Sequence, residues 1–102
     1  MITSRNGTIV YVNPAFERNT GYTRQEAVGQ NPRFLKSGVH DEAFYRQMWH
    51  TLAEGKAWHG TLTNRRKDGT HIQQEATISP IFNRDRAVIG HVAVERDVTE
   101  QL

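Results

Sequence analysis

The sequence predicts an α+β domain, in which helices pack on one face of a five-stranded antiparallel sheet. Three observations support this fold class. The first residues are rich in β-branched and aromatic side chains, the middle of the chain carries helix-start signals, and residues 58–98 alternate in polarity. Because strands and helices fall in separate runs, we expect several short helices and one longer helix grouped on a single face.

The chain begins with a predicted hairpin and a short helix. Residues 8–12 form a strand of the sequence Thr-Ile-Val-Tyr-Val, and the Asn6-Gly7 pair predicts a turn from an earlier strand at residues 2–3. Asn13-Pro14 predicts a helix start, since asparagine favours the N-cap and proline favours the first helical position. Gly21 is the expected end of this helix.

Two further helices are predicted in the middle of the chain. Residues 23–26 match a capping box, so a second short helix is expected to run to Gly29. Residues 30–40 are expected to be irregular because they contain proline and glycine. Asp41 is the predicted N-cap of the longest helix, which ends near Gly55. Its apolar stripe consists of Phe44, Met48, Trp49 and Leu52.

The rest of the chain predicts three strands that follow one another in a meander. Residues 58–64 and 72–78 alternate in polarity, and residues 67–70 (Lys-Asp-Gly-Thr) form a turn signal between them. A loop at residues 83–86 precedes a long, valine-rich final strand at residues 88–98. These three strands complete the five-stranded sheet.

Composition indicates one small domain that works inside the cell. The 102 residues are enough for a single core, and no cysteine is present to form a disulfide or bind zinc. We therefore expect a reducing, cytoplasmic environment. The net charge of +2 is too weak for a dedicated nucleic-acid binder, and no apolar run is long enough to cross a bilayer, so we expect neither nucleic-acid binding nor membrane contact by this domain. No constellation of side chains indicates catalysis, so we expect no enzyme activity.

Seven local motifs, in this order, resemble the PAS family of sensor domains. The motifs are residues 10–16, 20–22, 29–35, 58–60, 64–70, 78–81 and 95–99. The resemblance covers residues 1–102 as a single PAS sensor domain. It implies a domain cut from a larger signalling protein, such as a histidine kinase of a two-component system, with a C-terminal output domain in the same chain.

Within this family, the chain looks closest to the flavin-binding branch, which includes light-sensing (LOV) domains and redox-sensing FAD domains. Light-sensing members carry the motif Asn-Cys-Arg-Phe-Leu-Gln, and residues 31–36 here read Asn-Pro-Arg-Phe-Leu-Lys. Pro32 replaces the reactive cysteine, so a flavin–cysteine adduct cannot form. Lys36 replaces the glutamine. The resemblance implies FAD or FMN as the cofactor.

The flavin-ring contacts in those relatives fall by motif on Asn64, Gln74 and Glu95. Strand alternation gives an independent argument, because it places these three side chains on the helix-covered face if the strands pair as in the family. Polar groups buried there need partners. Either a planar ligand supplies them, or the three groups bond one another, the backbone or buried water. Glu95 is expected to have a raised pKa and to respond to flavin reduction, or else to lie on the surface as an ion-pair partner.

Three other residues carry alternatives of the same kind. Trp58 is predicted either to stack on the cofactor or to pack in the core. Asn31 is predicted either to bind the ligand or to cap local backbone. His40 resembles the position of the haem ligand in haem-binding PAS domains, which makes haem a third alternative. The second alternative to flavin binding, besides haem, is a cofactor-free module that only dimerises and relays a signal.

The final strand predicts how a signal leaves the domain. Val88, Val92 and Val94 lie on the face opposite the predicted site, so the outer face of the sheet is partly apolar. An open apolar patch usually marks an interface, and we expect a homodimer through this face and flanking helices. Residues 96–99 resemble the exit motif of PAS domains, and residues 100–102 look like the start of a following helix.

Overall fold

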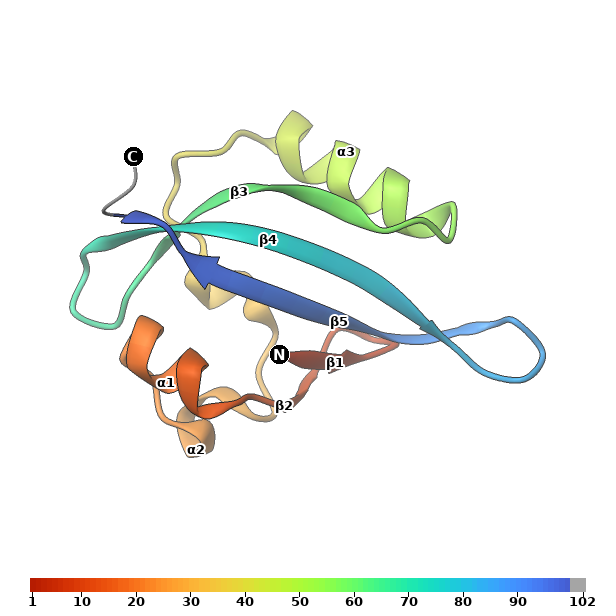
Figure 1. Cartoon of the computed structure of the whole chain (residues 1–102), viewed down its shortest axis with the longest axis horizontal. Coiled ribbons are helices and arrows are strands. Elements are labelled where there is room, and N and C mark those ends of the chain that lie inside the picture. The colour runs from red at the N-terminus through yellow and green to blue at the C-terminus, as the bar shows by residue number, and fades with distance from the viewer. Residues whose placement is uncertain (100–102) are drawn as a thin grey trace.

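The structure is a computed structural model that describes residues 1–99. It contains the five strands and the helices that the sequence predicts (Figure 1). In chain order they are β1 (Ile2–Ser4), β2 (Ile9–Tyr11), α1 (Pro14–Thr20), α2 (Arg24–Ala27), the 3₁₀ helix η1 (Pro32–Leu35), α3 (Glu42–Ala53), β3 (Trp58–Arg65), β4 (His71–Phe82) and β5 (Val88–Asp97). The predicted α+β fold is confirmed.

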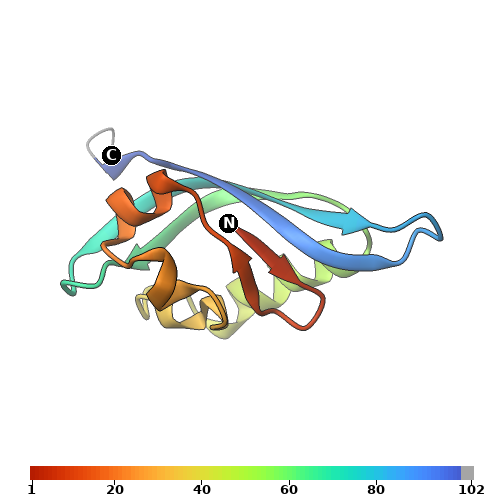
Figure 2. The same ribbon diagram turned by 90° about the horizontal axis from the view of Figure 1, so that it is seen from below.

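All neighbouring strands of the sheet are antiparallel, in the order β2-β1-β5-β4-β3. The long strands β4 and β5 form the largest part of it, and β1 attaches the short N-terminal hairpin to the other edge of β5. The sheet is arched, and the helices gather beneath its concave side (Figure 2). The helices therefore cover the concave face of the sheet.

The short helices begin where the capping signals predict. The side chain of Asn13 accepts a hydrogen bond from the Phe16 backbone N–H at 2.9 Å. Gly21 ends α1 with a φ of 80°, a left-handed conformation that favours glycine. The predicted capping box at the start of α2 is also present. However, α2 ends at Ala27 and does not reach Gly29, because Val28 already adopts an extended backbone conformation.

Two expectations for the middle of the chain need correction. Residues 32–35 form the helix η1 where we expected irregular chain, because the Asn31 side chain caps the Arg33 backbone N–H and Pro32 takes the first helical position. In α3, Met48 and Leu52 are buried as predicted, but the Trp49 side chain is exposed, at 54% of its maximum. Trp49 lies at the border of the apolar stripe, in edge-to-face contact with His91.

The core consists of two separate apolar clusters. One lies under the N-terminal hairpin and α1 and includes Ile9, Phe16 and Leu35. The other lies under α3 and includes Leu52 and Trp58. No helix in residues 1–99 combines the length and the apolar character that a bilayer span requires. The gap between the two clusters is where the site described below is found.

Candidate functional site

A cavity of about 510 Å³ lies between the concave face of the sheet, α3 and η1. It is lined by residues of both core clusters, such as Leu35 and Met48, and so separates them. Cavities that bind cofactors and drug-sized molecules usually measure about 300–1,000 Å³. The predicted hollow therefore exists, with a volume suited to a small planar molecule.

Most of the cavity wall is apolar. Helix α3 contributes Tyr45, Met48, Trp49 and Leu52, which lie on one face because they are spaced by three or four residues. The sheet contributes Leu62, Ile78 and Ala93 from its three long strands. Two apolar walls that face each other suit the two faces of a flat aromatic ring system.

One edge of the cavity is polar and carries two of the three predicted strand residues, Asn64 and Glu95, whereas Gln74 lines a smaller cavity beside α1. The Asn64 side-chain N–H donates a hydrogen bond to the Gln74 side-chain oxygen at 2.9 Å. The Gln74 amide also lies near the Glu95 carboxyl and lowers its pKa, an effect smaller than that of burial. Gln74 does not line this cavity, but it holds the Asn64 side chain at its edge. Asn64 and Gln74 are only 8% and 2% exposed. All three side chains thus lie on the helix-covered face, where Asn64 and Gln74 are directly hydrogen-bonded.

Glu95 is the ionisable one of these three residues. Burial raises the pKa of its carboxyl, because removal from water disfavours the charged form. Glu95 also lines a second, smaller cavity of about 210 Å³ beside α1, which Asn13 and Asn19 border. Its carboxyl therefore stands between two cavities and can act as a hydrogen-bond donor over a wider pH range than an exposed glutamate.

Asn31 caps local backbone, which is one of the two roles that the sequence left open. Its side-chain oxygen accepts hydrogen bonds from the backbone N–H and the side chain of Arg33, at 3.0 and 3.2 Å. Asn31 and its neighbour Pro32 also line the cavity. Because only the oxygen is used for capping, the amide N–H group remains for a ligand.

Trp58 and His40 do not line the cavity. The Trp58 ring packs in the core over Gly60, and its N–H donates to the Gln47 side chain at 2.9 Å. The Nε2 atom of His40 accepts a hydrogen bond from the Thr63 backbone N–H, also at 2.9 Å. This nitrogen faces strand β3, so the geometry gives no support to a haem ligand at His40. In residues 1–99, no three His, Asp or Glu side chains lie close enough together to hold a metal ion.

Tyr45 and Lys36 form a feature of the wall that the sequence did not predict. The Lys36 ammonium lies 4.1 Å from the centroid of the Tyr45 ring, and both residues line the cavity. The Tyr45 hydroxyl oxygen is buried and has no hydrogen-bond partner in the described part of the chain. Burial also raises the pKa of this phenol. The spacing of Tyr45 from Met48 and Leu52 was the available signal, but the predicted stripe began at Phe44.

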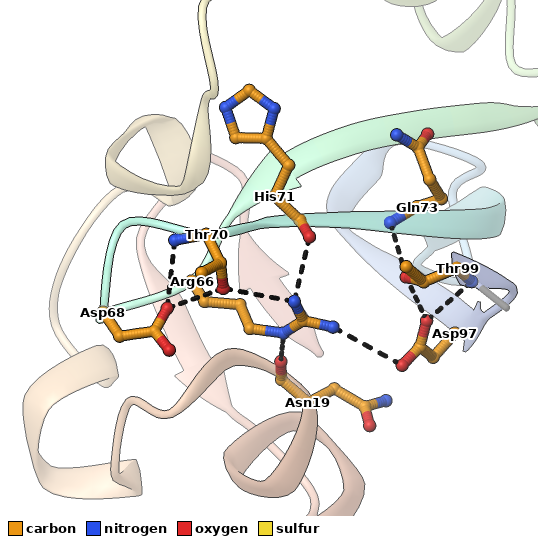
Figure 3. Close-up of polar contacts among 8 residues, drawn as sticks. All are labelled: Asn19, Arg66, Asp68, Thr70, His71, Gln73, Asp97 and Thr99. Atoms are coloured by element: carbon orange, nitrogen blue, oxygen red, sulfur yellow. Dashed lines mark hydrogen bonds and ion pairs between the residues drawn. The ribbon is translucent and has the colours of Figure 1, made fainter.

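A second polar cluster surrounds the end of β5 (Figure 3). Arg66 donates hydrogen bonds to the backbone carbonyls of Asn19 and His71, and its guanidinium lies 3.7 Å from the Asp97 carboxylate. Asp97 in turn accepts hydrogen bonds from the backbone and hydroxyl of Thr99, which lower the pKa of Asp97. Arg66 therefore contacts α1, β4 and the C-terminal end of β5 at the same time. Residues 100–102, which were expected to begin an exit helix, lie outside the described residues.

Comparison with known proteins identifies the family. The profile of the PAS domain family matches residues 1–100, and the chain belongs to this family. It is a sensory type of domain, since PAS domains are generally sensory modules and not catalysts.

The nitrogen fixation regulatory protein of Klebsiella oxytoca is 36% identical over 98 residues, which cover 96% of this chain and 20% of that protein. Among solved structures, an RNA-binding light-oxygen-voltage receptor has a TM-score of 0.90 and 33% identity, over 98% of this chain and 29% of that one. A light-oxygen-voltage domain studied with a flavin analogue has a TM-score of 0.88 and 27% identity, over 98% and 76%. The chain thus spans about a fifth of the length of this regulatory relative.

Proposed function

We propose that this PAS domain binds a flavin, FAD or FMN, and relays a redox or small-molecule signal to an output domain. The observation that carries the proposal is the polar edge of Asn64 and Glu95 on a cavity with apolar walls, with Gln74 hydrogen-bonded to Asn64. A flavin has the matching shape, because its ring system is flat and carries polar atoms along one edge. The similarity to a light-oxygen-voltage domain that was studied with a flavin analogue supports the same ligand class.

Different residues of the cavity would contact different parts of the flavin. Met48, Leu52 and Ile78 would hold the faces of the ring system, and Asn64 would bind its polar edge. A bound flavin supplies the redox chemistry, and its reduction adds a proton at the ring. Glu95 would respond through its carboxyl, whose raised pKa lets it donate a hydrogen bond in one redox state and lose it in another. The sequence has no cysteine, so a covalent photochemical adduct is not part of this function.

The signal would leave the domain along β5. Glu95 lies two residues before Asp97, which Arg66 holds at the end of this strand. We propose a C-terminal output domain in the same chain and a homodimer through the outer face of the sheet and flanking helices. The Val94 side chain on that face is 67% exposed, which supports an apolar contact there. This organisation suits a cytoplasmic signalling protein.

Flavin binding to the purified protein tests the proposal. Titration with FMN, FAD and riboflavin, followed by calorimetry and flavin absorbance, should show one-to-one binding of at least one of them. Ala93→Leu should reduce the affinity, because Ala93 lines the cavity and a larger side chain would occupy part of it. Val94→Leu is the matched control on the same strand, since Val94 points to the outer face. Absence of binding to all three flavins, or equal loss in both variants, would contradict the proposal.

A second candidate function is a cofactor-free module for dimerisation and relay. One observation favours it: Asn64 and Gln74 hydrogen-bond each other, so part of the polar edge is satisfied without a ligand. In that case the purified protein binds none of the added flavins. It forms a dimer, which analytical ultracentrifugation would detect. Val94→Glu should then shift the protein to the monomer, because it places a charge in the apolar outer face.

A further inference from the structure

The Tyr45 hydroxyl is a buried polar group that the protein leaves without a partner. Its oxygen is shielded from solvent and makes no hydrogen bond with any residue in 1–99. Buried hydroxyl groups are almost always hydrogen-bonded, and each exception asks for an explanation. Tyr45 belongs to the face of α3 that lines the cavity, so an explanation through the cavity ligand is available.

The neighbouring side chains do not supply the missing partner. The Phe44 ring, which packs edge-to-face against Tyr45 with centroids 5.3 Å apart, has no polar atom. The His40 ring packs in the same manner at 5.9 Å, and its Nε2 atom already accepts from the Thr63 backbone. The Lys36 ammonium rests on the ring face, 4.1 Å from the centroid, and offers only donors. The hydroxyl proton therefore has no acceptor among these contacts.

The chemistry of the group fixes what it would bind. Burial raises the pKa of Tyr45, so its hydroxyl keeps its proton at neutral pH and is available as a donor. The Lys36 side chain is long and flexible, so its ammonium can move from the ring face when a ligand enters. Both groups then favour the same kind of ligand atom, an oxygen or nitrogen that accepts hydrogen bonds.

We propose that Tyr45 selects the ligand of the cavity by donating a hydrogen bond from its hydroxyl to an acceptor atom of that ligand. This inference rests on the proposed function, and it adds a contact that lies on the helix, away from the three strand residues. It implies that the cavity prefers heteroaromatic ligands with a carbonyl or ring nitrogen toward α3 over purely apolar ligands of the same size.

The test is Tyr45→Phe, which removes only the hydroxyl. In the ligand-free protein this variant should be as stable as the wild type or more stable, because it removes an unpaired buried group. Its affinity for the flavin that the wild type binds best should fall about tenfold, which corresponds to about 1.4 kcal/mol. The carbonyl stretching bands of the bound flavin should also shift upward in the infrared spectrum if the lost bond ends on a carbonyl.

Tyr11→Phe is the matched control, because Tyr11 is half exposed and does not line this cavity. It should leave flavin affinity unchanged. If Tyr45→Phe binds flavin as tightly as the wild type, or if it lowers the stability of the ligand-free protein, the role of Tyr45 is wrong while flavin binding stands. If the wild type binds none of the flavins, the proposed function itself fails, and the role of Tyr45 fails with it.

Discussion

Replacing Gln74 with leucine tests its hydrogen bond with Asn64 at the polar edge of the cavity. Gln74 is 2% exposed, and its side-chain oxygen accepts from Asn64 at 2.9 Å. Leucine has a similar size but leaves the Asn64 amide without this partner. An unsatisfied buried polar group costs about 1–3 kcal/mol, so we expect the free energy of unfolding to fall by about 2 kcal/mol.

Urea denaturation of the ligand-free protein measures this change. Domains of this size lose about 1–3 kcal/mol of stability per molar urea, so a loss of about 2 kcal/mol moves the midpoint by roughly 1 M. The control is Glu75→Leu, the adjacent position on the opposite face. Glu75 forms an ion pair with Arg96 in which both side chains are 62% exposed, and such a pair contributes about 0–1 kcal/mol.

A double variant separates the lost hydrogen bond from other effects of leucine. If Asn64 is also replaced by leucine, no unpaired amide N–H remains, so the double variant should be more stable than the sum of the two single changes predicts. We expect a coupling of about 1–3 kcal/mol. A Gln74→Leu protein as stable as the wild type, or strictly additive effects, would refute the argument that these amides are buried and paired.

Three further changes have defined outcomes. Gly7→Ala should lower the thermal midpoint and cost about 1–2 kcal/mol, because Gly7 has a φ of +84° and an added Cβ would lie 2.8 Å from the Asn31 side chain. Burial raises the pKa of Glu95, so the wild type loses stability as the pH rises above the ordinary value of 4.5. Glu95→Gln should therefore be more stable than the wild type in urea at pH 7 but not at pH 4, and a difference independent of pH would contradict this. Arg66→Met should cost about 1 kcal/mol, since Arg66 is 27% exposed and loses its contact with Asp97, whereas an unchanged urea midpoint would show that the cluster adds nothing.

The sequence predicted best those features that depend on a few neighbouring residues. The helix starts at Asn13, Thr23 and Asp41 are correct, because an N-cap hydrogen bond spans only three residues. The direction of the strand side chains is also correct, since alternation follows from the backbone alone. That is why Asn64 and Gln74 were expected on the face where the structure has them.

Other features depend on how distant segments pack, and the sequence did not contain a sufficient signal for them. Phe44 and Tyr45 are adjacent aromatic residues, and either of them fits a helical spacing to the rest of the α3 stripe. The predicted stripe began at Phe44, so the contribution of Tyr45 to the cavity was missed. Trp49 was expected in the apolar stripe because of its helical spacing, yet its side chain is 54% exposed at the border of the stripe. The direct bond between Asn64 and Gln74 depends on the register of β3 and β4, which alternation does not determine.

The strand register places the residues near the polar edge of the cavity beside the C-terminal end of β5. Gln74, which hydrogen-bonds Asn64 at this edge, pairs across β4 and β5 with Asp97, the residue that Arg66 holds. The next residue toward the N-terminus, Gln73, donates its backbone N–H to the Thr99 hydroxyl and accepts from the Val98 backbone N–H. A change in hydrogen bonding at Gln74 therefore acts on the same short stretch of β4 that holds the exit from β5. Since paired strands resist independent movement, this stretch couples the Asn64–Gln74 pair to residues 97–99.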